Sequence, residues 1–334
     1  MADALISPAV GGTAWVASAA AVAYATAKIK NELGEKKVPL MAVAGAFVFA
    51  AQMINFTIPA TGSSGHIGGG ILLAGLLGAF PALLTIAAVL AIQCLFFADG
   101  GLLALGCNIF NMGVIPCLAV YPLIFKPLLR GGYTVKRISL ASIVSVVAGL
   151  QIGAFGVVLE TLASGVTALP FGAFVALMQP IHLAIGVVEG IVTAAALDFV
   201  FAMRPEILES SGSGVSLPQA VSVKKTLLAL GAATLVVGGI LSLFASAYPD
   251  GLEWSMEGVA GTAELEAEGP AFRQAEAIQE ATAFMPDYGF PSDEEGSAAG
   301  TAVAGIVGSL LTCALAGLAG FVIWRVKNSR GKPA

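Results

Sequence analysis

The chain has only two histidines, and the surroundings of the first favour the binding of a metal ion or another small ligand. His66 lies in the run GHIGGG, residues 65–70, directly before an apolar stretch. Glycines on both sides remove side-chain bulk and allow backbone conformations that other residues avoid. Imidazole is the commonest metal ligand in proteins. The alternative is a structural histidine whose ring is hydrogen-bonded to a backbone carbonyl.

Four further polar residues lie in or at the ends of apolar stretches. His182 and Glu189 are seven residues apart, so they share one face of a helix. They could form a polar relay or an interhelical hydrogen-bond anchor, and ionisable residues at membrane depth are functional candidates by default. Asn108 and Asn111 begin another apolar stretch, where their amides could hold a metal ligand in place.

The composition places these residues in a membrane. Hydrophobic residues make up 57% of the chain and charged residues 11%, with a mean hydropathy of +0.90. A soluble domain has roughly 25% charged residues. We therefore expect a multi-pass membrane protein that is surrounded by lipid and has no nucleic-acid partner. The four cysteines form no CxxC pair, which argues against a disulfide framework or a thiolate metal site.

The predicted fold is an all-α integral membrane protein with about nine transmembrane helices, since each span needs about 20 mostly apolar residues. The third is short and glycine-rich, and the seventh contains Pro170 and Pro180, which predict a kink or a re-entrant piece. The expected spans are roughly 10–27, 38–56, 67–79, 82–98, 104–125, 138–162, 168–203, 226–247 and 299–324.

The basic residues predict the orientation. Fifteen of the 16 Lys and Arg residues fall in four clusters, within 28–37, 126–137, 204–225 and 325–332. With nine spans, all four clusters lie on one side of the membrane, and the positive-inside rule makes that side cytoplasmic. The N-terminus and His66 are then outside, and the C-terminus is in the cytoplasm.

The chain divides into a seven-helix body (1–204), a flexible linker (205–225) and a two-helix module (226–334). An acidic loop, residues 248–298, connects the two helices of the module on the outside. It has twelve carboxylates and one basic residue, Arg273. It either concentrates cations near the surface or is a solvated connector, with a helix over 263–284 that breaks near Gly269.

Several stretches together resemble a known family. They are MADALISP (1–8), residues 39–56, GHIGGG (65–70), GCNIFNMG (106–113) and His182 with Glu189. The body resembles the substrate-binding (S) component of energy-coupling factor transporters for cobalt and nickel, of the CbiM/NikM type. The second module is similar to their small N component, through PDGLEW (249–254) and MPDYGF (285–290).

The resemblance implies a function. The protein would be the substrate-capture subunit for high-affinity uptake of Co²⁺ or Ni²⁺ in a bacterial or archaeal cytoplasmic membrane, feeding cobalamin synthesis or nickel enzymes. The metal ion is the transported substrate, and we expect no resident cofactor. As a transporter subunit the chain is not expected to be an enzyme, and it has no GxxxxGK[ST] phosphate loop for hydrolysing ATP. ATP hydrolysis would belong to two ATPase (A) subunits, which act with a transmembrane coupling (T) component.

The resemblance also implies the ligands. Family members usually begin Met-His, and the terminal amine, a backbone nitrogen and that imidazole bind the metal together with a histidine like His66. Such a planar nitrogen set suits Ni(II), although cobalt also accepts nitrogen ligands. This chain begins Met1-Ala-Asp3, and we expect the true start two residues upstream. His66 is the main expected ligand, with Met1 and Asp3 in the N-terminal segment, and Asn108, Asn111, His182 and Glu189 in support.

Two other functions fit parts of the sequence. Residues 62–65 match the GxSG pattern of intramembrane serine proteases, with Ser64 as the nucleophile and His182 as the base. A membrane scaffold that transports nothing and binds a partner through its acidic loop is the second alternative.

Overall fold

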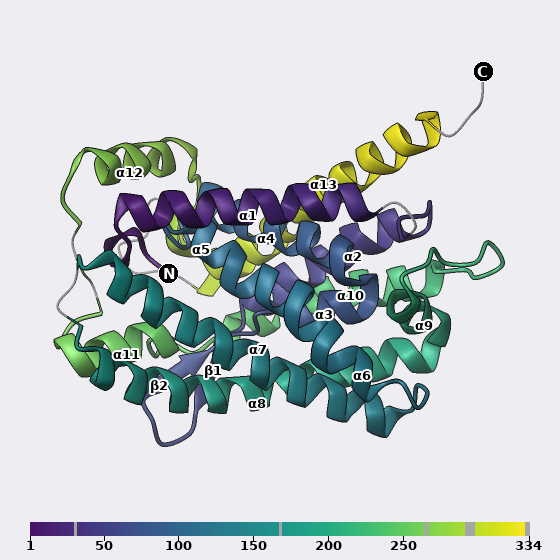
Figure 1. Ribbon diagram of the computed structural model, residues 1–334, viewed down its shortest axis with the longest axis horizontal. Coiled ribbons are helices and arrows are strands. Elements are labelled where there is room, and N and C mark those ends of the chain that lie inside the picture. The colour runs from purple at the N-terminus through teal and green to yellow at the C-terminus, as the bar shows by residue number, and fades with distance from the viewer. Residues whose placement is uncertain (30–31, 167–168, 264, 266, 291–297, 331–334) are drawn as a thin grey trace.

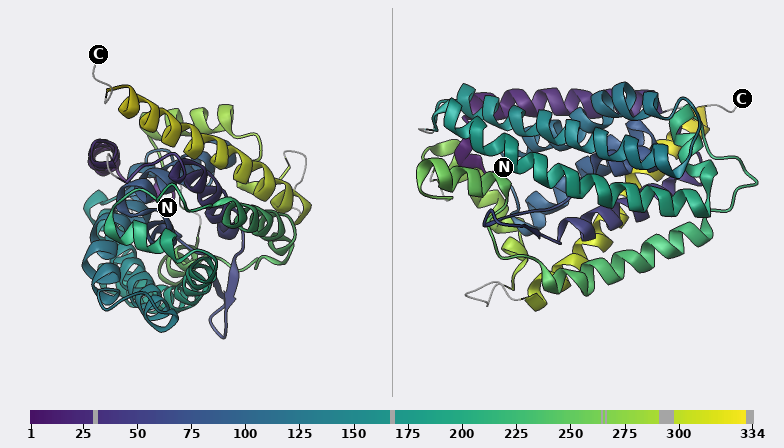
Figure 2. Two further views of the ribbon diagram at one scale, coloured as in Figure 1. Left: turned by 90° about the vertical axis from the view of Figure 1, so that its right-hand side faces the viewer. Right: turned by 90° about the horizontal axis from the view of Figure 1, so that it is seen from below.

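Membrane-length helices run along a common direction and form the body of the protein. The computed structural model describes residues 1–29, 32–166, 169–263, 265, 267–290 and 298–330. Within them, seven helical segments are long and apolar enough to cross a membrane. They are α1 (Pro8–Lys28), α4 (Ala79–Phe97), Leu105–Leu128, α7 (Val135–Ser164), α8 (Phe171–Met203), Lys224–Phe244 and α13 (Ala298–Arg330). Figure 1 shows the helices lengthwise and the left view of Figure 2 shows them nearly end-on. The length and apolar composition of these helices confirm the prediction of a mostly helical membrane protein.

Two of these segments change helix type along their length. The third consists of α5 (Leu105–Ile109), the π-helix η3 (Phe110–Phe125) and α6 (Lys126–Leu128), with Pro116 and Pro122 inside the π-helix. The sixth is α10 (Lys224–Gly239) followed by the 3-10 turn η4 (Leu241–Phe244).

The predicted second and third spans take shorter forms. Helix α2 (Lys37–Gln52) has 16 residues. Helix α3 (Gly70–Leu77) has eight, which is about 12 Å of helix against a hydrocarbon thickness of about 30 Å. The third predicted span, residues 67–79, is therefore short as predicted, and its helix covers only residues 70–77. Gly69, with φ of 79°, and Gly78, with φ of 89°, have backbone conformations that bound the helix at both ends.

An antiparallel hairpin fills the connection from α2 to α3. Strand β1 (Phe56–Ile58) pairs with β2 (Ser63–Gly65), with Phe56 opposite Gly65. His66 follows β2 directly. Residues 66–69 then connect β2 to helix α3. Within α3, the Gly75 carbonyl accepts a hydrogen bond from the Ser211 hydroxyl at 2.5 Å.

The segment predicted as a flexible linker is largely ordered. Residues 205–213 form helix α9 (Pro205–Ser213), with Ile207 and Leu208 buried. Beyond it, the Lys36 ammonium donates to the carbonyl oxygens of Pro218 and Val221 at 3.2 and 2.6 Å. The serines and glycines predicted flexibility, but burial of the apolar residues and these lysine contacts fix the segment.

Helix α8 is continuous across Pro180, so the expected re-entrant piece is absent from this helix. Pro170 precedes its first residue, a position where proline does not interrupt a helix. In the acidic loop, the structure has α11 (Gly251–Ala260), α12 (Pro270–Thr282) and the short turn η5 (Pro286–Tyr288). The predicted break near Gly269 is the start of α12, and Glu264 and Glu266 lie outside the described residues.

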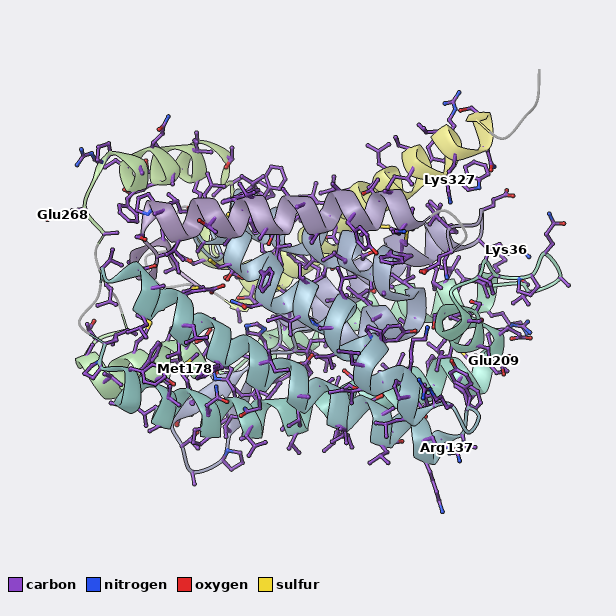
Figure 3. All side chains as sticks on the ribbon, in the orientation of Figure 1. Lys36, Arg137, Met178, Glu209, Glu268 and Lys327 are labelled. Atoms are coloured by element: carbon purple, nitrogen blue, oxygen red, sulfur yellow. The ribbon has the colours of Figure 1, made fainter. Side chains whose placement is uncertain are left out.

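The charges are distributed unequally between the two ends of the bundle. Lys36, Arg137 and Lys327 lie at one end, and Glu268 in the acidic loop lies at the opposite end (Figure 3). Helix α13 packs against α2, where the Ser309 hydroxyl donates to the carbonyl oxygen of Ala46 at 3.1 Å. The C-terminal two-helix module is thus joined to the body along α2.

Candidate metal site

The predicted polar residues meet at one cavity. Its volume is about 160 Å³, and it lies among the segment after β2, helices α7 and α8 and the π-helix η3. The first residues of α11 also line it. Six of the seven residues predicted for the site line this cavity, namely Met1, His66, Asn108, Asn111, His182 and Glu189.

The His66 ring is held at the mouth of this cavity. Its Nδ1 lies 3.1 Å from the carbonyl oxygen of Ile67, which places the ring proton on Nδ1 and leaves Nε2 as the free electron-pair donor. Metal-binding histidines commonly have their other nitrogen bonded in this way. The predicted structural hydrogen bond and a ligand role for His66 are therefore compatible.

The glycines around His66 are required by close contacts. A Cβ atom on Gly65 would lie 2.6 Å from the Ile185 side chain of α8. One on Gly69 would lie 2.5 Å from the Val48 side chain, at a backbone φ of 79° that already favours glycine. The peptide can therefore lie directly against α2 and α8, and this brings His66 to the cavity.

Glu189 places a carboxylate at the inner part of the cavity. Its side chain is 2% exposed, and its Oε1 accepts a hydrogen bond from the Gly69 N–H at 2.9 Å. Oε2 is buried and has no hydrogen-bond partner among the described residues. A buried carboxylate without a compensating charge is costly, so a cation in this cavity would be stabilised.

The other predicted residues support the cavity wall. His182 has Nδ1 2.8 Å from the carbonyl oxygen of Met178, one turn earlier in α8. Asn108 Nδ2 donates to the Met1 carbonyl at 3.4 Å. Asn111 Nδ2 donates to Glu160 at 2.8 Å, while its Oδ1 is buried without a partner among the described residues.

Asp3 lies elsewhere. Its carboxylate accepts a hydrogen bond from the Ala104 N–H at 2.8 Å, and its side chain is outside the lining of the cavity. Asp3 is the one predicted site residue that the structure does not bring to the cavity wall, because the backbone amide before α5 binds this carboxylate.

Two buried glutamines are functional candidates that the sequence did not single out. Gln52 Nε2 donates to the Gly68 carbonyl at 3.1 Å, and Gln93 Nε2 donates to Gln52 Oε1 at 3.0 Å. They fix the peptide after His66 from the side of α2 and α4. Their signal in the sequence is an amide inside an otherwise apolar helix.

The C-terminal module covers the cavity. The Ser64 N–H donates to the Pro249 carbonyl at 2.8 Å, and Trp254 Nε1 donates to the Thr61 carbonyl at 3.0 Å. Asp250 and Gly251 consequently line the cavity that holds His66. No pattern in the sequence predicted this contact, because the paired residues lie far apart in the chain.

A capping box fixes the residues over the cavity. Asp250 Oδ1 accepts from the N–H groups of Leu252 and Glu253 at 2.8 and 2.9 Å, and Glu253 Oε2 accepts from the Asp250 N–H at 3.0 Å. Partial burial raises the pKa of the Glu253 carboxyl, and the charge of Asp250 raises it further.

A second cavity of about 420 Å³, called the outer cavity below, is also lined by His66. Four carboxylates line it, those of Asp99, Asp250, Glu253 and Asp287. His66 and Asp250 therefore line both the outer cavity and the first, inner cavity that holds Glu189.

The arrangement is not a cluster of side-chain ligands. Among the described residues, no group of three or more His, Cys, Asp or Glu side chains is placed to hold a metal ion. A site here would combine His66 with main-chain nitrogens, and Met1 is one possible source of these on the cavity wall.

Ser64 has a structural environment. Its side chain is fully buried, and its hydroxyl donates to the Tyr248 carbonyl at 2.7 Å. His182 Nδ1 is engaged with Met178 instead. This geometry does not support a serine nucleophile with His182 as its base.

Comparison with known proteins finds two families that together match most of the chain. The family described as "Cobalt uptake substrate-specific transmembrane region" matches residues 1–207, and the "PDGLE domain" matches residues 224–325. The chain is 31% identical over 330 residues to a protein of Archaeoglobus fulgidus named "Putative fused nickel transport protein NikMN", covering 97% of each chain. It is 30% identical over 217 residues to the "Probable fused nickel transport protein LarMN" of Lactiplantibacillus plantarum, covering 61% of this chain and 64% of the relative.

Two crystal structures of transition metal transporters have a similar fold. One, of a truncated transporter, gives a TM-score of 0.53 at 29% identity and covers 61% of this chain and 98% of its own. The other structure gives a TM-score of 0.54 at 26% sequence identity, and the match covers 64% of this chain and 97% of the transporter chain.

Proposed function

Because the chain belongs to the family of cobalt uptake substrate-specific transmembrane regions and ends in a PDGLE domain, we propose that it captures Co²⁺ or Ni²⁺ outside the membrane. It does so as the substrate-binding subunit of an energy-coupling factor transporter. The relatives named as nickel and cobalt transport proteins support this proposal.

The observation that carries the proposal is the pairing of His66 with Glu189 in one cavity. The imidazole Nε2 donates an electron pair, and the nitrogens of the N-terminal segment at Met1 provide further donors. The unpartnered Oε2 of Glu189 supplies negative charge beside them. Nitrogen ligands next to one carboxylate, which can ionise when a cation enters the cavity, suit a divalent transition metal ion.

The orientation follows from the basic residues. The end of the bundle with Lys36, Arg137 and Lys327 is cytoplasmic by the positive-inside rule. The hairpin, His66 and the acidic loop then face the outside. The carboxylates of the outer cavity attract divalent cations toward His66.

The free energy for transport comes from ATP hydrolysis by partner subunits. We propose a transmembrane coupling component and two ATPase subunits, since the chain has no phosphate-binding loop of its own. The membrane is the cytoplasmic membrane of a bacterium or archaeon, and the imported ion supplies cobalamin synthesis or nickel enzymes.

Titration of the purified full chain with Ni²⁺ and Co²⁺ tests the proposal. We expect about one bound ion per chain, lost in His66→Ala and retained with lower affinity in His182→Gln. The titration is repeated with Met-His placed before Met1, because the family resemblance implies an imidazole at that position. Equal binding in His66→Ala and the parent protein would refute the site, and it is the result that a scaffold predicts.

A further inference from the structure

The loop between α4 and α5, residues 98–104, holds the N-terminal segment. The Gly101 N–H donates to the Met1 carbonyl at 3.0 Å, and the Ala104 N–H donates to Asp3 at 2.8 Å. The loop thereby sets where the main chain of Met1 lies on the wall of the His66 cavity. Any change in the loop would move these nitrogens relative to His66.

This loop has a backbone that needs support. Ala98 has a φ of 53°, a left-handed conformation that costs a residue with a Cβ atom free energy, and Gly100 has a φ of 76°. The loop also follows the end of α4, where helix carbonyl groups lose their partners within the helix. Contacts from outside the loop are therefore expected to determine its conformation.

One side chain of the C-terminal module makes three of these contacts. Gln279 of α12 donates from Nε2 to the carbonyl oxygens of Cys94 and Gly100 at 3.0 and 2.9 Å. Its Oε1 accepts from the Leu102 N–H at 3.3 Å. The two carbonyls face the amide NH₂ and the N–H faces the amide oxygen, so one primary amide matches all three backbone groups.

Tyr288, another residue of the C-terminal module, also holds the end of α4 and loop 98–104. The Tyr288 hydroxyl donates to the Asp99 carboxylate, and its ring stacks on Phe97 with 5.1 Å between centroids. The Met285 N–H donates to the Phe96 carbonyl at 3.4 Å. The end of α4 and the loop after it are thus held from two separate elements of the module.

We infer that Gln279 is a positioning residue for metal capture, which fixes loop 98–104 and, through it, the main chain of Met1 beside His66. This inference rests on the proposed function, because it matters for transport only if the N-terminal segment contributes to the ion site. Gln279 does not line the inner cavity, so it acts on the ion only through the loop.

The test uses the full chain in detergent and measures two quantities. Hydrogen exchange followed by mass spectrometry reports on residues 1–7 and 94–104, and titration reports Ni²⁺ affinity. Gln279→Ala removes all three hydrogen bonds. Gln279→Glu keeps the shape and the acceptor for Leu102 but places an oxygen opposite two carbonyl oxygens. Gln274→Ala is the matched control, since Gln274 is an exposed glutamine of the same helix.

We expect faster exchange in both segments for both Gln279 variants, and Ni²⁺ affinity lower by about tenfold or more, as for other residues that orient metal ligands. Peptides from α8 and the Gln274→Ala protein should match the parent. Unchanged exchange in residues 1–7 and 94–104, or an equal effect of Gln274→Ala, would overturn the inference. Absence of Ni²⁺ binding in the parent protein would refute the proposed function instead, while the exchange measurement would still decide whether Gln279 fixes the loop.

Discussion

The backbone N–H of Gly69 donates a hydrogen bond to the Glu189 carboxylate over 2.9 Å, three residues after His66. This bond ties the glycine-rich peptide to the middle of α8. It occupies only Oε1 and leaves Oε2 buried and unpartnered among the described residues. The same carboxylate thus orients the peptide that carries the proposed ligand and, in the proposed site, would provide charge for the ion.

Replacing Glu189 by glutamine separates these two roles. The amide oxygen of the Glu189→Gln variant can still accept from Gly69, but the side chain has no charge, so we expect Ni²⁺ affinity to fall by about tenfold or more. The metal-free protein should unfold at the same or a higher temperature, because a buried unpaired charge has been removed. Asp198→Asn is the control on the same helix, since Asp198 bonds Ser139 outside the cavity. Unaltered Ni²⁺ affinity in Glu189→Gln would contradict the charge role.

Two glycines near the hairpin should differ in their tolerance of alanine. Both have positive φ, 79° at Gly69 and 74° at Gly62, so each alanine costs about 1 kcal/mol in backbone energy. At Gly69 the new Cβ also meets Val48 at 2.5 Å, whereas at Gly62 nothing lies within 4 Å. We expect Gly69→Ala to cost roughly a further 1–3 kcal/mol through overpacking. Thermal unfolding of both variants checks this, and equal losses of stability would show that the peptide can move away from α2.

The sequence indicated the residues of the site better than their arrangement. His66, Glu189 and the two asparagines were recognisable because polar groups in apolar stretches are rare. Their meeting at one cavity depends on the packing of α7, α8 and the hairpin, which local patterns do not specify. Asp3 does not line the cavity, because a nearby backbone N–H binds its carboxylate.

The fold was predicted well where apolar stretches were long. The third span was predicted to be short, and its helix is shorter still than residues 67–79, because glycines at both ends stop the helix while hydropathy continues. The contact between PDGLEW and the His66 hairpin joins residues far apart in the chain, so neither segment alone carries a signal for it. The order in 205–213 came from buried Ile207 and Leu208, two apolar residues among many polar ones.

The capping box over the cavity makes a prediction about pH. Partial burial and Asp250 raise the pKa of Glu253 above its ordinary value of 4.5, so the folded protein binds this proton more tightly than the unfolded chain. The Glu253 contribution to stability therefore declines as the pH rises from the ordinary pKa through the raised one. In Glu253→Gln the amide oxygen can still accept the hydrogen bond from the Asp250 N–H, and the side chain has no ionisation that would lower the stability as the pH rises.

We accordingly expect Glu253→Gln to unfold at a higher temperature than the parent protein at about pH 7, with a difference that shrinks toward zero near pH 4. Thermal melts across this range measure it. Glu257→Gln, also in α11 but outside the capping box, is the control and should show no such trend. A lower unfolding temperature for Glu253→Gln than for the parent at about pH 7, with a gap that closes as the pH falls, would mean that the Glu253 carboxylate stabilises the fold in its charged form.

Substitution of Ser64 distinguishes transport from hydrolysis. The Ser64 hydroxyl donates to the Tyr248 carbonyl at 2.7 Å and so joins the hairpin to the C-terminal module. Ser64→Ala should destabilise the protein by about 1 kcal/mol, the net value of one such hydrogen bond. The backbone bond from Ser64 to Pro249 remains, so the hairpin should stay docked. One Ni²⁺ should still bind with affinity close to that of the parent, since the hydroxyl is not a ligand. Loss of a peptidase activity with metal binding absent from both proteins would instead make Ser64 a nucleophile and require His182 to leave Met178 during the reaction.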